Sequence, residues 1–539
     1  MTPTPMSTTR MTTRRTPRWV TVVKRGAAPV DPESGYVATH QVYNGMNTVW
    51  DAMLNQTEVG SNKNKFYVIQ VLHPAGNDNQ CFMFTRWGRV GERGQSKSNP
   101  LTSPTGAVSD FKKQFRAKSG VAWESRHGMV AGKGKYTWLE RSFEDESDDK
   151  KDDNAEMKDS PPIAASKLHP NIQTFCNFIF NARLIDATLS SMNYDANKLP
   201  LGKLAKNTIL QGFAALKRLA EAIDQPNGDL AKSMGGLANA CQELTSQYYS
   251  IIPHVFGRTR PTVINNAVAL KKELDLVDAL GDMQISHEVL NTALKLDEDG
   301  NLVNPVDSQY ASLGLTSMDP VDQGTSEFAR LAAYVRDTHG ETHSNISASI
   351  VNAFRVERAT ETEAWNNAGF DKLAAGERML LWHGSRSTNF AGILSQGLRI
   401  APPEAPVTGY MFGKGVYFAD IMTKSANYCH SYLSDNIGVM LLCEVAAKPF
   451  LELNDSSYTA DADCKAAKKL ATKGVGRTQP TEWEDAAAAL NHPELGGCHI
   501  PQGKPSNVNP DGAWLQYNEY IVYDPAQIRL RYLLMVKMR

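Results

Sequence analysis

The sequence predicts a multidomain α+β protein with a small mixed domain, an all-α helical bundle and a β-rich domain, in that order. Three observations predict this class. The chain has 539 residues, enough for about three or four average domains. Its pattern changes twice, from short apolar runs in a basic segment to helical periodicity, and then to short apolar runs separated by Gly, Pro and Asn. An acidic stretch with nothing to bury separates the first two parts.

The chain begins with a basic arm at residues 1–30. This arm carries six basic side chains and no acidic one. Pro3, Pro5 and Pro17 would interrupt any amphipathic helix, so we expect a disordered arm. The alternative is a mitochondrial transit peptide, since such peptides are also rich in Arg and poor in acids.

Residues 31–142 are predicted to form the small mixed domain. Segments 66–72 and 81–86 have the pattern of two strands joined in a hairpin. A helix is expected over 107–117, because Phe111 and Phe115 are four residues apart. Residues 1–141 hold 20 basic and 9 acidic side chains, a net charge of +11, whereas the whole chain has a net charge of -1. Such asymmetry is typical of a protein that meets a polyanion at one end.

The rest of the chain divides into a linker and two domains. Residues 143–166 include EDESDDKKDDNAEMKD, a self-repelling stretch that indicates a linker. Residues 167–305 are predicted to form a helical bundle, because apolar side chains recur at helical spacing. These are Ile209, Phe213, Leu216 and Leu219 on one face, and Leu270, Leu274, Val277 and Leu280 on another. Residues 306–539 form the β-rich domain, with the clearest strands at 380–383, 439–445 and 517–523.

The composition argues against several classes of protein. Seven cysteines are scattered from Cys81 to Cys498 without a C-x-x-C pair, which argues against a disulfide framework and a cysteine-rich zinc site. We therefore expect no metal. No apolar run approaches the roughly 18 residues of a transmembrane helix, so no membrane partner is expected.

Two clusters in the β-rich domain could bind a small molecule. His383 ends an apolar strand and precedes Gly384 and Ser385, and a glycine there lets a ligand approach the backbone closely. Tyr417 and Tyr428 lie close to the glycines of GKG at 413–415, and two such rings could enclose a flat group. Each feature alone is more often structural, a core histidine or a turn.

A third cluster surrounds Glu519. Strand alternation would place this carboxylate on the same face as Tyr517, Ile521 and Tyr523. A carboxylate on a largely apolar face costs free energy unless something uses it. The three clusters together predict a functional site more strongly than any one of them.

Together these residues resemble the catalytic domain of the poly(ADP-ribose) polymerase family, whose His-Tyr-Glu triad is matched by His383, Tyr417 and Glu519. The resemblance covers residues 381–420 and 516–524. Residues 200–219 and 246–257 are similar to the family's helical regulatory domain, and TRWGRVGERG at 85–94 is similar to its WGR domain. This order of WGR, helical and catalytic domains resembles the DNA-dependent second type within the family.

The resemblance implies NAD⁺ as the substrate, with no further cofactor, and acceptor proteins, including the chain itself, as partners. Nicotinamide is already a cationic leaving group, so one carboxylate suffices, and Glu519 would stabilise the positive charge that develops on the ribose. The same glutamate implies chain elongation. The other roles that the resemblance implies are carboxamide binding by Gly384 and Ser425, stacking on nicotinamide by Tyr417 and Tyr428, adenosine-ribose binding by His383, and contacts nearer the adenosine half by Ser385, Asn389 and Arg399.

The basic segment 86–141 has two interpretations. A solvated basic face is the plainer one. Trp87 beside Arg89 favours DNA, because a ring can stack on an exposed base or sugar while an arginine holds a phosphate. The resemblance implies binding to DNA strand breaks, as 5'-phosphorylated nicks or ends, with Trp87, Arg89, Lys112 and Lys113 as contacts.

The resemblance also implies regulation and a place in the cell. The helical bundle would cover the NAD⁺ cleft and loosen when DNA binds; otherwise the bundle merely packs against the catalytic domain. The acidic linker, with Ser147 and Ser160, is either a spacer or a region that the enzyme modifies. We expect residence in the nucleus. Segment 481–498 looks longer and more helical than the corresponding family loop, which leaves acceptor preference open.

Two other functions stay open at this stage. One is mono-ADP-ribosylation without elongation, and the other is a DNA-end-binding scaffold with a silent transferase fold. The sequence also leaves open whether an accessory factor completes the acceptor site.

Overall fold

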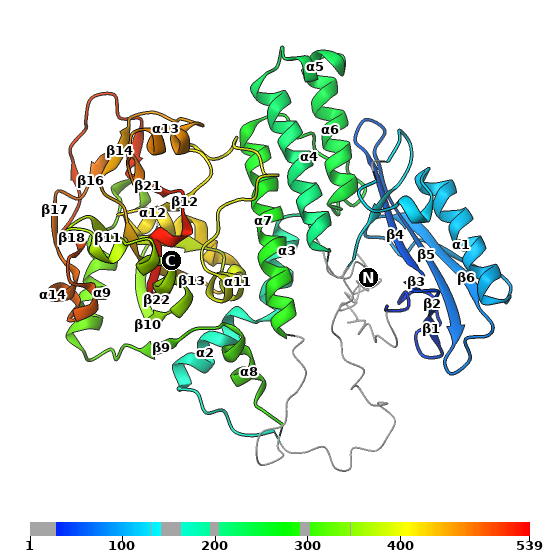
Figure 1. Ribbon diagram of the computed structural model, residues 1–539, viewed down its shortest axis with the longest axis horizontal. Coiled ribbons are helices and arrows are strands. Elements are labelled where there is room, and N and C mark those ends of the chain that lie inside the picture. The colour runs from blue at the N-terminus through cyan, green and yellow to red at the C-terminus, as the bar shows by residue number, and fades with distance from the viewer. Residues whose placement is uncertain (1–27, 130, 142–162, 195–203, 291–301, 345) are drawn as a thin grey trace, which may run out of the picture.

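The computed structural model describes residues 28–129, 131–141, 163–194, 204–290, 302–344 and 346–539. Most of the basic arm and of the acidic linker, including Ser147 and Ser160, lies outside these described residues. Figure 1 shows a sheet domain, a group of long helices and a β-rich domain in a row. The predicted multidomain α+β class is confirmed.

The N-terminal domain is an antiparallel sheet with the order β7-β6-β5-β4-β8 and β1 paired to β5. Its strands are β1 (His40–Val42), β4 (Asp51–Glu58), β5 (Lys63–Pro74), β6 (Phe82–Arg89), β7 (Gln95–Ser98) and β8 (Thr137–Leu139). A small ribbon of β2 (Asn44–Gly45) and β3 (Thr48–Val49) lies between β1 and β4 in the chain. The predicted hairpin is confirmed as β5 and β6, with Leu72 opposite Phe82.

One long helix, α1 (Pro104–Ser119), covers this sheet and includes the segment 107–117 predicted to be helical. Ser103 caps its start by accepting a hydrogen bond from the Gly106 N–H. The helix ends at Gly120, whose φ of 81° favours glycine. Phe111 and Phe115 are fully buried on its inner face, as their spacing predicts.

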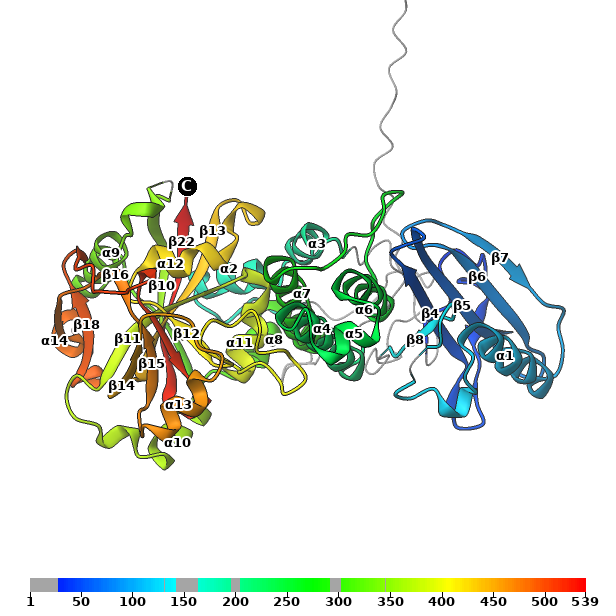
Figure 2. The ribbon, with the colours of Figure 1, turned by 90° about the horizontal axis from the view of Figure 1, so that it is seen from above.

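The helical region contains α3 (Ala182–Ser191), α4 (Lys206–Asp224), α5 (Asp229–Ser233), α6 (Leu237–Ile251) and α7 (Ala267–Leu290). Apolar faces of α4, α6 and α7 meet in one core, and the members of both predicted faces are buried there. Figure 2 shows these helices standing between the other two domains. The same core includes Met53 and Phe66 of the N-terminal sheet and Ala405 of the β-rich domain.

Two further helices belong to the β-rich domain by packing. They are α2 (Pro170–Ile179) and α8 (Pro305–Ser312). Phe175 and Ile179 of α2 join the core of Phe354 and Phe390, although α2 lies within the span expected for the bundle. Amphipathic spacing identified the helix, but it does not say which apolar surface the helix covers.

The β-rich domain is built on a seven-stranded sheet of order β17-β18-β11-β13-β22-β10-β9. These strands are β9 (Ser317–Pro320), β10 (Ala348–Glu357), β11 (Arg378–Ser385), β13 (Ile437–Ala446), β17 (Glu482–Asp485), β18 (Cys498–Gln502) and β22 (Ile528–Met538). A four-stranded sheet has the order β12-β21-β15-β14, formed by β12 (Val416–Phe418), β14 (Phe450–Leu453), β15 (Ala471–Gly474) and β21 (Glu519–Val522). The two sheets share one apolar core, with Leu441 and Leu533 from the first and Phe418 and Val522 from the second.

Shorter elements complete this domain. A three-stranded sheet joins β16 (Gly476–Gln479), β19 (Ser506–Asn507) and β20 (Leu515–Tyr517). The helices are α9 (Ser326–Asp337), α10 (Ala359–Asn367), α11 (Phe390–Gln396), α12 (Met422–Ala426), α13 (Ala460–Ala466) and α14 (Ala486–Leu490). All seven cysteines are free and buried. None of the helices described is long and apolar enough to cross a membrane.

The predicted strand 517–523 is broken at Asn518, which separates β20 from β21. Its side chain is buried, accepts a hydrogen bond from the Gly476 N–H at 2.8 Å and donates one to Asp420 Oδ2 at 2.7 Å. The Tyr517 ring lies against Gly340, and its hydroxyl lies 2.7 Å from the Thr342 hydroxyl. Strand alternation could not predict this, because the break depends on tertiary partners of the Asn518 side chain.

Candidate active site

A cavity of about 610 Å³ lies between the helical region and the β-rich domain. Helices α4 and α7 form one wall, and the end of β11, the segment 396–402 and strand β12 form the other. Among the predicted site residues, the cavity is lined by His383, Gly384, Ser385, Asn389, Arg399, Tyr417 and Tyr428. The structure therefore brings together residues predicted from separate motifs.

Strand pairing brings the three triad positions close in space. His383 is next to Trp382, which pairs with Ala419 just beyond β12. Tyr417 of β12 lies opposite Ile521 of β21, two residues after Glu519. His383, Tyr417 and Glu519 are thus held by three neighbouring strands.

The His383 ring is oriented by a backbone contact. Its Nδ1 lies 2.9 Å from the Tyr417 carbonyl oxygen, and burial lowers the pKa of His383. The imidazole is therefore neutral near pH 7, with Nδ1–H as donor and Nε2 left as an acceptor. An acceptor facing the cavity suits a sugar hydroxyl.

Gly384 permits a close approach that no other residue would allow. A Cβ at this position would lie 2.0 Å from the Ser425 carbonyl oxygen. The Ser425 hydroxyl, from α12, donates a hydrogen bond to the Trp382 carbonyl oxygen at 3.1 Å. The absence of a side chain at Gly384 thus lets β11 and α12 form one compact wall.

The two predicted tyrosines differ in how they are held. The Tyr417 hydroxyl donates to the Gly413 carbonyl oxygen at 2.8 Å and accepts from the Phe412 N–H at 3.0 Å. Tyr428 is half exposed in the cavity wall. One ring is fixed and the other presents a free surface, as a stacking pair for a flat ligand requires.

The Glu519 carboxylate is held by a lysine. Lys424 Nζ lies 2.9 Å from Glu519 Oε1 and also donates to the carbonyl oxygens of Tyr517 and Asn518. Burial lowers the pKa of Lys424, while Glu519 acts in the opposite direction. We did not predict Lys424 from the sequence, although it immediately precedes Ser425.

The three residues predicted nearer the adenosine half have different surroundings. Asn389 Nδ2 donates to Ser385 Oγ at 3.1 Å, so these two side chains form a pair at the end of β11. Arg399 forms an ion pair with Asp282 of α7 and donates to Gln396 Oε1 at 3.2 Å. Its guanidinium is thus already engaged by the helical region.

Helix α7 presents carboxylates to the cavity. Asp275, Asp278 and Asp282 are spaced three and four residues apart, which places them on one helical face. Burial raises the pKa of Asp278 to about 7 and that of Asp282 to about 6, although nearby Lys271 and Arg399 oppose the shift. Among the described residues, no group of three or more His, Cys, Asp or Glu side chains could hold a metal ion.

The predicted DNA contacts lie on the N-terminal domain. Trp87 stacks on Tyr67, with ring centres 5.8 Å apart. Lys113 is exposed on α1, and Lys112 pairs with Glu124 at 2.6 Å.

Arg89 faces the helical region. It donates to the Asn62 carbonyl oxygen and side chain at 3.0 Å each, and to the carbonyl oxygens of Gly257 and Thr259. Nearby, Asn55 and Asn64 donate to backbone carbonyl oxygens of segment 249–254. The two domains therefore share a polar interface that includes a predicted DNA contact.

Segment 481–498 is helical only in part. It forms β17, the five-residue α14, the short 3-10 helix at Pro493–Leu495 and the start of β18. None of its residues lines the cavity. In Figure 1, α14 lies on the side of the domain away from α7.

Comparisons with known proteins agree with the motifs. Family models match residues 325–538 (poly(ADP-ribose) polymerase catalytic domain), 166–310 (poly(ADP-ribose) polymerase regulatory domain) and 50–129 (WGR domain). The chain is 41% identical over 527 residues to poly [ADP-ribose] polymerase 2 of Arabidopsis thaliana, covering 96% of this chain and 78% of that protein. It is 37% identical over 522 residues to the human polymerase 2, covering 95% and 84%. A polymerase 1 from Gallus gallus is 36% identical, with 47% of its length covered.

Proposed function

Because this chain belongs to the poly(ADP-ribose) polymerase family, we propose that it is activated by DNA strand breaks and modifies proteins, including itself, in the response to DNA damage. It is an NAD⁺-dependent ADP-ribosyltransferase that forms poly(ADP-ribose). One observation carries the proposal: His383 and Tyr417 line a cavity beside the regulatory helices, and Glu519 begins the strand that pairs with the strand of Tyr417.

The chemical step needs one carboxylate. As the bond to nicotinamide breaks, positive charge develops on the ribose, and Glu519 stabilises it and orients the acceptor hydroxyl. Lys424, at 2.9 Å, holds the carboxylate in place. The intact glutamate favours elongation over single transfers.

The remaining roles are those that the resemblance to the family implies. Gly384 and Ser425 bind the carboxamide, while Tyr417 and Tyr428 stack on the nicotinamide ring. His383 accepts a hydrogen bond from the adenosine ribose through Nε2. Ser385, Asn389 and Arg399 contact the adenosine half, and Arg399 must first exchange its Asp282 partner.

DNA recognition resides in the WGR domain. Trp87, Arg89, Lys112 and Lys113 contact the DNA at 5'-phosphorylated nicks or ends, mainly through stacking and phosphate contacts. Because Arg89 bonds to the loop that contains Gly257 and Thr259, DNA that recruits its guanidinium weakens the domain interface. That interface shares an apolar core with α7, so DNA binding and loosening of α7 are coupled.

The domain division and the cellular setting complete the proposal. The WGR domain spans 31–142, the regulatory domain 167–305 and the catalytic domain 306–539, with a basic arm at 1–30 and an acidic linker at 143–166. The protein acts in the nucleus, where broken DNA is its activator. Two further points concern the acceptor site: whether an accessory factor completes it, and which acceptors it prefers. Analysis of the products tests both.

Incubation with labelled NAD⁺ tests this function. We expect label to enter the protein at least about tenfold faster with nicked DNA than with an intact circular duplex, because phosphate and stacking contacts form at the break. The product should run as long chains on a gel. A single discrete shift would indicate mono-ADP-ribosylation, and no incorporation with either DNA would indicate a scaffold.

A further inference from the structure

Arg386 is a half-buried cation in the NAD⁺ cavity that the catalytic and binding roles above do not use. It immediately follows Ser385 at the end of β11 and lines the cavity. Within the described part of the chain, its Nη1 is buried without a hydrogen-bond partner, and no carboxylate forms an ion pair with it. A buried guanidinium without these partners costs free energy unless a ligand supplies a hydrogen-bond acceptor or a negative charge.

Other arginines of the catalytic domain differ from Arg386 in their ion pairing, although the buried Nε atoms of Arg358, Arg378 and Arg531 also lack a hydrogen-bond partner. Arg355, Arg358, Arg378, Arg399, Arg529 and Arg531 each pair with a carboxylate. Arg399 is the informative case, because it lines the same cavity and its charge is met by Asp282. Of these two arginines, Arg386 is therefore the one with donors available to a ligand.

Arg386 lines the same cavity as Gly384, which is assigned to nicotinamide, and as Ser385 and Asn389, which are assigned to the adenosine half. The diphosphate of NAD⁺ joins these two halves and carries their negative charge. Arginine is well matched to phosphate oxygens, since its planar group can donate two parallel hydrogen bonds.

The charges around Arg386 fit an anionic ligand. His430 also lines the cavity, and burial lowers its pKa, with Arg386 acting in the same direction, so its ring is neutral. Asp275 of α7 lines the cavity as well and interacts electrostatically with Arg386, His430 and Tyr428. Asp275 pairs instead with Lys271 at 3.0 Å. The regulatory helix thus presents a carboxylate to the site without forming a salt bridge there.

We infer that Arg386 binds the diphosphate of NAD⁺, and that Asp275 competes with that diphosphate for the same positive charge. This inference rests on the proposed function. Arg386 thereby gains a binding role. The charge of Asp275 on α7, and not only the bulk of that helix, then helps determine the affinity for NAD⁺.

Steady-state kinetics of the full chain with nicked DNA test the inference. Arg386→Met keeps the length of the side chain and removes its charge, and we expect the KM for NAD⁺ to rise about 10- to 100-fold with less than about threefold change in kcat. Arg386→Lys should lie between this variant and the wild type, because it keeps the charge but not the paired donors. Inhibition by nicotinamide, which carries no phosphate, should be unchanged in both variants.

A double-mutant cycle isolates the competition. Asp275→Asn should lower the KM for NAD⁺ in the wild-type background and have no effect in Arg386→Met, because the interaction needs both charges. An unchanged KM in Arg386→Met, or a parallel loss of nicotinamide inhibition, would overturn the inference. If the wild type does not turn over NAD⁺, the proposed function fails, and calorimetric binding of ADP-ribose to the wild type and Arg386→Met still decides the role of Arg386.

Discussion

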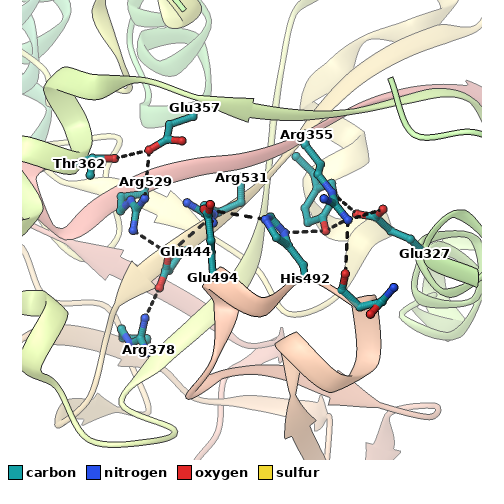
Figure 3. Close-up of polar contacts among 12 residues, drawn as sticks. Glu327, Arg355, Glu357, Thr362, Arg378, Glu444, His492, Glu494, Arg529 and Arg531 are labelled. Atoms are coloured by element: carbon teal, nitrogen blue, oxygen red, sulfur yellow. Dashed lines mark hydrogen bonds and ion pairs between the residues drawn. The ribbon is translucent and has the colours of Figure 1, made fainter. Parts of the chain in front are cut away.

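The two ends of strand β11 differ in whether the charged side chains around them form ion pairs with one another. At its start, Arg378 donates to Glu444, a fully buried carboxylate that Arg529 and Arg531 also approach within 4 Å. Arg531 pairs in turn with Glu494 at 2.7 Å. Figure 3 shows this network extending through His492 toward Glu327 and Arg355. At the start of β11, the acidic and basic side chains therefore form ion pairs with one another.

At its other end, β11 leads into the cavity, where charges remain incompletely matched. Within the residues that the structure describes, Arg386 forms no ion pair with a carboxylate, and the carboxylates of α7 face the site that NAD⁺ would occupy. The difference teaches that a closed charge network holds a fold in one geometry, whereas mismatched charges at a cavity are available to a ligand. Substitutions at the first end should change stability, and those at the second should change NAD⁺ use.

The largest effect is expected from a substitution that disrupts the ion pairs around Glu444. Glu444→Gln removes the carboxylate between Arg378, Arg529 and Arg531, and should lower the free energy of unfolding of the catalytic domain by about 3–5 kcal/mol, because buried cations lose their counter-charge. Thermal unfolding measures the loss. As a control, Glu494→Gln should cost less, since Glu494 is 63% exposed. Equal losses in the two variants would contradict the account.

The next effect lies at the cavity end. Glu519→Gln should lower the rate of chain elongation about 100- to 1000-fold, because the developing positive charge loses its carboxylate. Thermal stability and nicotinamide inhibition should stay near those of the wild type. Product length on a gel is the measurement, and long chains made by this variant would refute the assigned role.

A smaller effect concerns the contact between α7 and Arg399. Asp282→Asn should raise the rate without DNA about two- to fivefold, because an ion pair that helps hold α7 is lost while Arg399 stays partly exposed. The matched control is Asp229→Asn on α5, which is exposed and away from the cavity. A rise in both variants would show that the effect does not come from this contact.

The smallest expected effect is a pH dependence of the docked state, in which α7 packs across the cavity. Burial raises the pKa of Asp278 to about 7, in the presence of Lys271, Asp275, Asp282, Arg399 and Tyr410. A raised carboxyl pKa means that the docked state holds its proton more strongly, so docking is most stable at low pH and weakens as pH rises to about 7.

We therefore expect the ratio of DNA-free to DNA-activated rates to increase a few-fold between pH 5.5 and 8. Taking this ratio cancels the pH dependence of the chemical step. Asp278→Asn should flatten the profile. An equally steep profile in that variant would assign the effect to other groups.

Much of the fold was predictable because local patterns carry it. The β5–β6 hairpin, α1 and strands β11 and β13 follow from apolar spacing and turn residues, since those signals act over a few residues. The placement of α2 in the catalytic core and the break at Asn518 were not predictable in this way. Both depend on partners distant in the sequence.

The sequence by itself determined the chemistry that the site can perform. His383, Gly384, Tyr417 and Glu519 stand in motifs whose residue types suit NAD⁺ and one catalytic carboxylate. The motifs do not predict the strand pairings that bring His383, Gly384 and Tyr417 to one cavity, with Glu519 on the neighbouring strand.

Only the tertiary structure decided which charges are satisfied. Arg386 and Arg399 lie in the same segment of sequence, yet Asp282 of α7 meets one and leaves the other available. The physical reason is that an ion pair depends on distance and burial in space, and these were set when α7 packed across the cavity. Tertiary packing likewise determined that Arg89 of the N-terminal domain bonds to the loop of the helical region that contains Gly257 and Thr259.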